Sequence, residues 1–138
     1  MKFYLSSRYG RIHEMQAMAA WLRNQGHTVT STWLDGDESL DTDTPSHDVA
    51  REWAFADIED IRAADCLVAF TEQPQSPWSR GGRHVELGYA MGMGKSTVVV
   101  GPLENIFCHV THMWCETAGE FMDWVRECAT VTVEGDAC

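Results

Sequence analysis

Residues 66–71 read CLVAFT, residues 83–93 read RHVELGYAMGM and residues 96–101 read STVVVG. The first and the last are continuous apolar runs of the kind found in parallel strands that are covered on both faces. We expect the segment between them to form a helix. A strand, a helix and another strand in this order predict a right-handed crossover between parallel strands.

The alternation of strands and helices continues on both sides of this unit. We expect further strands at 2–6, at 27–34 and near 110–114, and further helices at about 11–25, 48–63 and 117–128. The predicted fold class is α/β, in a single domain over residues 1–138. It is a doubly wound, mostly parallel sheet of about five strands, flavodoxin-like or Rossmann-like, with helices on both faces.

The composition is that of an ordinary globular protein, with 44% hydrophobic and 22% charged residues. No apolar stretch approaches the roughly 20 residues of a membrane span, and no secretion signal opens the sequence. We therefore expect a cytoplasmic protein without a membrane partner. The formal net charge of -11 argues against a nucleic-acid polymer as partner, because such a surface repels phosphates. A small nucleoside or nucleotide remains possible, because a local pocket can bind it.

The five cysteines are expected to be free thiols, several of them buried in the core. They are Cys66, Cys108, Cys115, Cys128 and Cys138. The segment 108–115 (CHVTHMWC) concentrates thiols and imidazoles, but it lacks the second pair of ligands that zinc sites usually have. We expect neither a metal nor an organic cofactor.

In doubly wound sheets, ligands bind outside the carboxyl ends of the strands. The segment 81–90 (GGRHVELGYA) follows such a strand end. The double glycine allows a tight turn and lets a ligand approach the backbone at Gly82. Glu86 is expected in the first helical turn, where the helix dipole would lower its pKa and keep it ionised as a nucleophile. The alternative is a glutamate that only complements the helix dipole.

A second acidic cluster lies in the helix expected at 48–63. Asp57 and Asp60 are three residues apart and share one helical face. Asp57 lies toward the middle of the helix, where an aspartate is neither a cap nor a good helix former. A partly buried carboxyl there could keep its proton and donate it to a leaving base. The alternative is a solvated acidic face balanced by Arg51 and Arg62.

The turn after the first strand carries hydroxyls and guanidinium groups, which suit an anionic or hydroxylated ligand. The candidate binding residues are Ser6, Ser7, Arg8 and Arg11. Neither a GxGxxG fingerprint nor a P-loop is present. Most tryptophans are expected to be core or interface anchors, although Trp33, Trp53 or Trp78 could line a pocket.

Four sequence segments, in order, resemble the nucleoside 2-deoxyribosyltransferase family and its nucleotide N-glycosidase relatives, the 2′-deoxynucleoside 5′-phosphate N-hydrolases. They are Tyr4-Leu5-Ser6-Ser7, the Asp-x-x-x-Ile-x-x-Ala-Asp pattern at 57–65, Glu-Leu-Gly-Tyr-Ala at 86–90, and the Lys-x-x-x-Val strand at 95–99 followed by Asn105-Ile106-Phe107. The resemblance covers most of the chain.

The resemblance implies a role for each matching residue. Glu86 would attack the anomeric carbon and form a glycosyl-enzyme ester, and Tyr4 would orient that carboxylate. Asp57 would protonate or hydrogen-bond the departing base. Asn105 would hold the 5′ end of the sugar, in a pocket that an adjacent subunit could share. We therefore expect a homodimer or a larger homo-oligomer.

One position departs from the transferase pattern. The transferases carry an acidic residue about six positions before the nucleophile, where this chain has Arg80. Transfer to another base and hydrolysis of a nucleoside monophosphate both remain open, since the hydrolase relatives bind a 5′-phosphate with a turn containing serine and arginine. A non-catalytic nucleotide-sensing module on the same fold is the alternative from another functional class.

Overall fold

The computed structural model describes residues 1–36, 44–73 and 81–134, with the backbone alone from residue 129. Arg80, Trp78 and Cys138 lie outside the described residues. Within them, five parallel strands form one sheet in the order β2-β1-β3-β4-β5. The strands are β1 (Lys2–Ser6), β2 (Thr28–Val29), β3 (Cys66–Phe70), β4 (Ser96–Val100) and β5 (Met113–Cys115).

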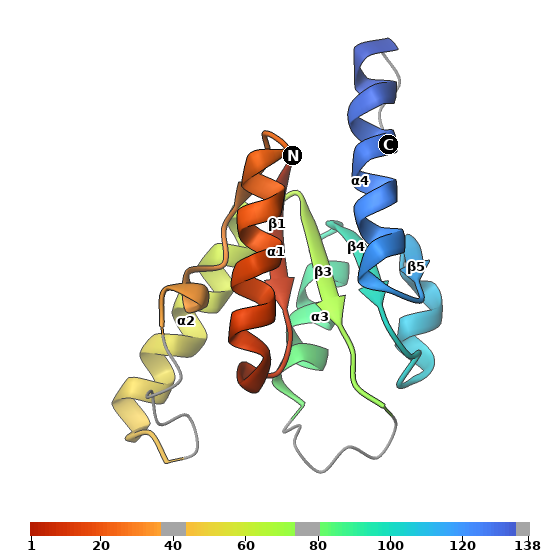
Figure 1. Ribbon diagram of the computed structural model, residues 1–138. Coiled ribbons are helices and arrows are strands. Elements are labelled where there is room, and N and C mark those ends of the chain that lie inside the picture. Colours follow the sequence, from red (N-terminus) through yellow and green to blue (C-terminus); the bar gives the residue numbers. More distant parts are fainter. Residues whose placement is uncertain (37–43, 74–80, 135–138) are drawn as a thin grey trace.

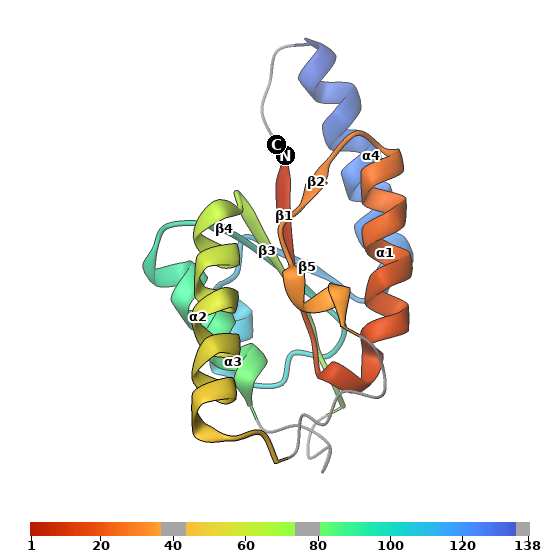
Figure 2. The ribbon, with the colours of Figure 1, turned by 90° about the vertical axis from the view of Figure 1, so that its left-hand side faces the viewer.

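Helices cover both faces of the sheet, as the sequence predicts (Figures 1 and 2). They are α1 (Ile12–Asn24), α2 (His47–Ala63), α3 (Gly82–Gly92) and α4 (Ala118–Glu134), and three short 3-10 helices join them: η1 (Tyr9–Arg11), η2 (Thr32–Asp35) and η3 (Ile106–Val110). Helices α1 and α4 pack on one face, and α2 and α3 pack on the other. The strand order and the crossovers are those of a doubly wound α/β fold.

The alternation of side chains along β1 assigns its residues to the two faces. Phe3 and Leu5 belong to the core beneath α1 and α4, whereas Tyr4 belongs to the core beneath α2 and α3. Ser6 lies two residues after Tyr4, so it points to the same face as Tyr4. Both Tyr4 and Ser6 are fully buried. The end of β1 therefore presents two hydroxyl groups to the face that α2 and α3 cover.

The predicted strand at 27–34 is wrong in length. Only Thr28 and Val29 pair with β1, and the chain then turns into η2. Beyond that point, side chains take over the hydrogen bonds that a longer strand would make. Ser31 Oγ accepts from Leu5 N over 2.6 Å, and Trp33 Nε1 donates to Leu5 O over 2.8 Å.

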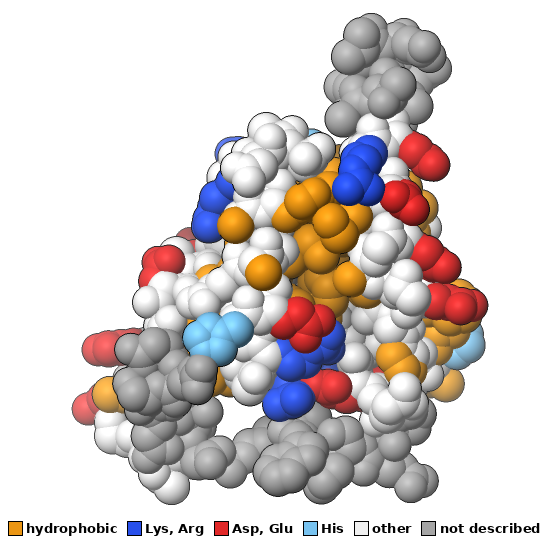
Figure 3. All heavy atoms as spheres, viewed as in Figure 1, with side chains coloured by type: hydrophobic (Ala, Val, Ile, Leu, Met, Phe, Trp, Pro, Cys, Tyr) orange, Lys and Arg blue, Asp and Glu red, His pale blue; other side chains and the backbone are white. Residues whose placement is uncertain are grey.

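On the face seen in Figure 3, an apolar strip runs between α1 and α4, and charged side chains gather below it at the carboxyl ends of the strands. Trp21 and Met122 pack against the core beneath this strip, and the Arg126 guanidinium lies 5.1 Å from the centre of the Trp21 ring. None of the helices among the described residues has the length and apolarity needed to cross a membrane.

Three of the cysteines are free and buried, as expected: Cys66, Cys108 and Cys115. Cys128 is disulfide-bonded, so the expectation of a free thiol is wrong at this position.

Candidate functional site

The carboxylate of Glu86 meets the two hydroxyls at the end of β1. Tyr4 Oη donates a hydrogen bond to Glu86 Oε2, and Ser6 Oγ donates to Glu86 Oε1 over 3.1 Å. Gly81, with a φ of 85° in the left-handed region, turns the chain into α3 and so brings Glu86 over β1. The hydrogen bond between Tyr4 and Glu86 joins residues that are 82 positions apart in sequence.

Asp57 lies beside this pair on α2. The charges of Asp57 and Asp60 both act on Tyr4 and on Glu86. Asp60 is itself held at the start of η2, where its Oδ2 accepts from Thr32 N over 2.8 Å and from Thr32 Oγ1 over 2.6 Å. The expected arrangement, with Asp57 and Asp60 on one face of the helix and Asp57 partly buried, is therefore present.

Both catalytic candidates hold their protons more tightly than ordinary carboxyls. Burial and the charge of Asp60 raise the pKa of Asp57 to about 6, against a weaker opposing effect of Tyr4. Burial and the charges of Asp57 and Asp60 raise the pKa of Glu86 to about 7, against the opposing effect of the hydrogen bonds from Tyr4 and Ser6. The pKa of Tyr4 is also raised, first by burial and then by the Glu86 and Asp57 charges, so its hydroxyl keeps its proton.

The expectation of a low pKa for Glu86 is wrong. The first turn of α3 contains no acidic residue, because the helix begins at Gly82 and Glu86 is its fifth residue. The favourable interaction with the helix dipole falls off beyond that turn. Burial beside two other carboxylates is the stronger influence.

Two cavities of similar size meet at Asp57. One, of about 310 Å³ between α2 and α3, is lined by Asp57, Glu86 and Gly82, with Ile58, Val85 and Tyr89 among its apolar walls. The other, of about 290 Å³ between α2 and η2, is lined by Asp57 and by the aromatic rings of Tyr9, Trp33 and Trp53. Trp33 and Trp53 therefore line a pocket, as considered from the sequence.

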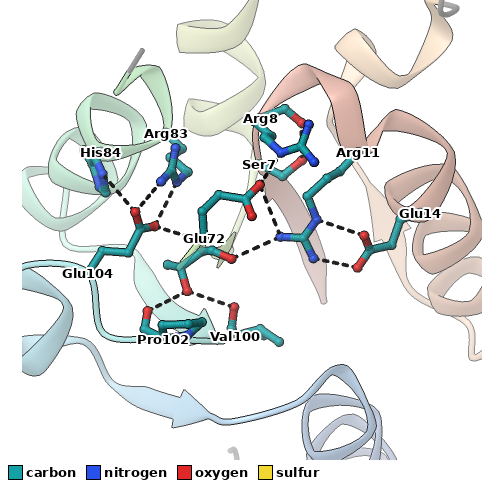
Figure 4. A network of polar contacts seen from close by, with 11 residues as sticks. Ser7, Arg8, Arg11, Glu14, Glu72, Arg83, His84, Val100, Pro102 and Glu104 are labelled. Carbon is teal, nitrogen blue, oxygen red and sulfur yellow. Dashed lines mark hydrogen bonds and ion pairs between the residues drawn. The ribbon is translucent and has the colours of Figure 1, made fainter. Parts of the chain in front are cut away.

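The arginines after β1 lie in a separate network at the carboxyl ends of the strands (Figure 4). Arg8 Nε contacts Glu72 Oε1 at 2.5 Å, and Arg11 binds both oxygens of Glu14 at 2.6 and 2.8 Å. Arg11 Nη1 also lies 4.0 Å from Glu72 Oε1. Ser7 Oγ donates to the backbone oxygen of Arg8 over 2.9 Å. Ser7, Arg8 and Arg11 thus lie together, but each contacts other protein groups.

Asn105 does not join the cavity of Glu86. Its amide Nδ2 lies 3.2 Å from His84 Nδ1, and its Oδ1 caps η3 by accepting from Phe107 N over 2.9 Å. It lines a third cavity, of about 450 Å³, on the other side of α3 together with His84, Gly88 and Phe107. The resemblance implied a contact between Asn105 and the sugar, and within one chain this residue lies away from the carboxylate pair.

The structure adds charged residues that the sequence interpretation did not single out. Glu104 binds the guanidinium of the buried Arg83 through both oxygens and accepts from Glu72 N over 2.9 Å (Figure 4). Glu72 and Glu104 follow the ends of β3 and β4. Their position outside the carboxyl ends of parallel strands was the signal that could have identified them.

The described residues contain no group of three or more histidine, cysteine or acidic side chains that could hold a metal ion. The segment 108–115 therefore forms no such group within the part of the chain that the structure describes.

A family model described as Nucleoside 2-deoxyribosyltransferase matches residues 4–132. No curated protein matches the chain significantly in sequence. Several solved structures share its fold. The 2-deoxyribosyltransferase of Bacillus psychrosaccharolyticus is 20% identical with a TM-score of 0.68, and the match covers 88% of this chain and 90% of that one.

Two further structures are similar over nearly their whole length. The Clostridium botulinum CMP N-glycosidase BcmB is 18% identical with a TM-score of 0.58, covering 92% of this chain and 99% of that one. A 2-deoxyribosyltransferase from Leishmania mexicana is 15% identical with a TM-score of 0.59, covering 91% and 97%. At these identities the likeness supports the fold.

Proposed function

Since the chain belongs to the nucleoside 2-deoxyribosyltransferase family, we propose that it cleaves the N-glycosidic bond of a (deoxy)nucleoside through a covalent intermediate on Glu86. The observation that carries this proposal is the Glu86 carboxylate, bound by the hydroxyls of Tyr4 and Ser6 and bordering the same cavity as Asp57. Retaining glycosidases usually use two carboxyl groups that flank the glycosidic bond to be cleaved.

In the first step, the ionised Glu86 attacks C1′ of the sugar. A bond forms between a carboxylate oxygen and C1′, and the bond from C1′ to the base nitrogen breaks with its electron pair going to the base. Asp57 donates a proton to the departing base, for which its raised pKa suits it. In the second step, another base or water attacks C1′, and the ester bond to Glu86 breaks with its electron pair going to the carboxylate. Asp57 takes the proton of the attacking base or water.

The two cavities suggest how the substrate binds. The aromatic cavity of Tyr9, Trp33 and Trp53 suits a planar nucleobase. The neighbouring cavity borders Glu86 and suits the sugar. Asp57 lines both, so its carboxyl would lie close to the bond between base and sugar.

The charges at the strand ends favour a nucleoside over its 5′-monophosphate. Arg8 and Arg11 are the cations that a 5′-phosphate would need, and Glu72 and Glu14 already neutralise them. A phosphate bound there would lie close to these two carboxylates, which would repel it.

The proposal is tested by incubating the protein with deoxynucleosides, ribonucleosides and their monophosphates, with and without an acceptor base, and following base release by chromatography. We expect turnover in the wild type and none above background in Glu86→Ala. Mass spectrometry of the intact protein after rapid quenching should show a glycosyl adduct that Glu86→Ala lacks.

The same experiment separates transfer from hydrolysis, because a new nucleoside forms only if the acceptor base attacks. Wild-type activity in Glu86→Ala would rule out the proposed nucleophile. Tight nucleotide binding by calorimetry with no turnover over hours would instead support the non-catalytic sensing module.

We also propose that the protein is a homodimer. Four apolar side chains of α3 and η3 are at least 61% exposed: Val85, Ile106, Phe107 and Val110. Val85 and Phe107 line the same cavity as His84 and Asn105, and monomeric proteins seldom expose an apolar group of this kind. A second copy that covers this face would place Asn105 at the interface.

A further inference from the structure

The two oxygens of the Glu86 carboxylate are bound by two side chains of one strand. Tyr4 Oη donates to Oε2, and Ser6 Oγ donates to Oε1 over 3.1 Å. The two donors are two residues apart on β1, so the sheet fixes the spacing between their hydroxyls. A carboxylate with a donor at each oxygen is held in one orientation about its terminal torsion, which is otherwise broad.

Ser6 is placed to serve Glu86 and not the substrate. It is 0% exposed, and its backbone is paired with Ala69 in the interior of the sheet. Among the described residues, the linings of the three cavities above do not include Ser6. A ligand that fills the cavity beside Glu86 therefore meets the carboxylate and not the serine.

From this geometry we infer that Ser6, expected from the sequence to bind substrate, is a positioning residue that holds the Glu86 carboxylate and favours its ionised form. The inference rests on the proposed function of Glu86 as the nucleophile. Tyr4 alone cannot donate to both oxygens of Glu86, because a tyrosine hydroxyl has one proton and donates it to one carboxylate oxygen. Ser6 donates to the other oxygen.

The surroundings of Glu86 make a second donor necessary. Burial and the negative charges of Asp57 and Asp60 all favour the protonated carboxyl, which is a poor nucleophile. Hydrogen bonds to the ionised form act in the opposite direction. Because the resulting pKa lies near neutrality, the loss of one hydrogen bond changes the ionised fraction at physiological pH.

The test is Ser6→Ala, with the pKa of Glu86 measured directly from the ¹³C shift of its carboxyl carbon in protein labelled at glutamate. The signal is assigned by its loss in Glu86→Gln. We expect the pKa to rise by about one unit. In wild type and variant, kcat/KM is measured against pH, and its optimum should move to higher pH. Starting from a pKa of about 7, kcat/KM at pH 7 should fall about fivefold, while KM changes less than twofold.

Two further variants make the test specific. Ser6→Cys keeps the size of the side chain with a weaker donor, and its shift should be smaller; it also serves if Ser6→Ala fails to fold. Ser96→Ala removes a serine from the exposed amino end of β4 and should leave the pKa and the rate unchanged.

An unchanged pKa of Glu86 in Ser6→Ala overturns the inference, as does a rise in KM without a shift of the pH optimum, which would mark Ser6 as a substrate ligand. The carboxyl titration needs no substrate. Its failure is therefore distinct from failure of the proposed function, which the activity of Glu86→Ala decides.

Discussion

At the scale of single residues, the site contains two carboxyl groups whose pKa values lie in the opposite order to the one that the proposed reaction needs. Asp57 has to be protonated to act as an acid, yet its pKa, about 6, is the lower one. Glu86 has to be ionised to attack, yet its pKa is about 7. The two groups titrate as a coupled pair, and the active form is the pair with one proton, which is most populated between the two pKa values.

This arrangement predicts a bell-shaped dependence of kcat/KM on pH, with its maximum between pH 6 and 7. Activity falls with decreasing pH because Glu86 becomes protonated, and it falls with increasing pH because Asp57 loses its proton. In Asp57→Asn we expect kcat to drop by about 10²- to 10⁴-fold, the usual contribution of a general acid, and the alkaline limb to disappear. The acid limb should remain, because it then reports the ionisation of Glu86 alone. Measuring kcat and kcat/KM of both proteins over a series of pH values tests these changes.

The control for this prediction is Glu59→Gln, which removes an exposed carboxylate from the same helix. Its pH profile should match that of the wild type. An alkaline limb that persists unchanged in Asp57→Asn would show that another group donates the proton.

The sequence identified the members of this pair and the raised pKa of Asp57, but not the raised pKa of Glu86. Asp57 could be found because an aspartate is unusual in the middle of a predicted helix. Glu86 could be found because it follows a glycine turn at a strand end, and Tyr4 through the family resemblance. The direction of the pKa shift of Glu86 could not be found, because it depends on burial between α2, α3 and β1 and on the charges of Asp57 and Asp60. These are tertiary contacts, which helical spacing does not reveal.

At the scale of secondary-structure elements, consecutive residues of the loop after β4 hold consecutive residues of α3. Glu104 binds Arg83, and Asn105 contacts His84. Both contacts lie in the first turn of α3, immediately before the turn that carries Glu86. Glu104 also accepts from Glu72 N at the end of β3, so one carboxylate connects the helix to two strands.

Breaking this connection should be costly, because Arg83 is 5% exposed. In Glu104→Gln the buried guanidinium loses the carboxylate of Glu104, and we expect the free energy of unfolding to fall by about 1–3 kcal/mol. Urea denaturation followed by circular dichroism measures this change. The double variant Arg83→Met, Glu104→Leu should lose less stability than Arg83→Met and Glu104→Leu lose in sum, because both charges are then absent. Additive losses in this cycle would contradict a direct coupling between the two side chains.

Most elements were predictable from periodicity, and the exceptions have local causes. The helices at α1, α2 and α3 begin and end within one or two residues of the expected positions. The strand expected at 27–34 is shorter because Ser31 and Trp33 bind the backbone of Leu5 through their side chains. The β-branched residues favour a strand there, but they do not reveal that side chains make these hydrogen bonds in place of the backbone.

At the scale of the whole molecule, two features act against each other in self-association. A net charge of -11 causes copies to repel one another at low salt. The exposed side chains of η3 are apolar, with Ile106 at 76% and Val110 at 70% exposure. Association through this face would bury apolar surface and avoid bringing acidic side chains together, so it should be favoured by added salt.

Val110→Asp tests this mode of association. Its side chain is exposed in the single chain, so the substitution should leave the fold and the midpoint of thermal unfolding of the monomer nearly unchanged. In a dimer formed through η3, however, it would bury a charge opposite another apolar surface, and we expect at least a tenfold weaker association. Light scattering after size exclusion, across a range of protein concentrations, measures the mass directly. Val49→Asp is the matched control. Val49 is 36% exposed on α2, and α3 lies between α2 and η3. A wild-type mass equal to one chain of 15.5 kDa at micromolar concentration would contradict the dimer, and equal weakening in both variants would place the interface elsewhere.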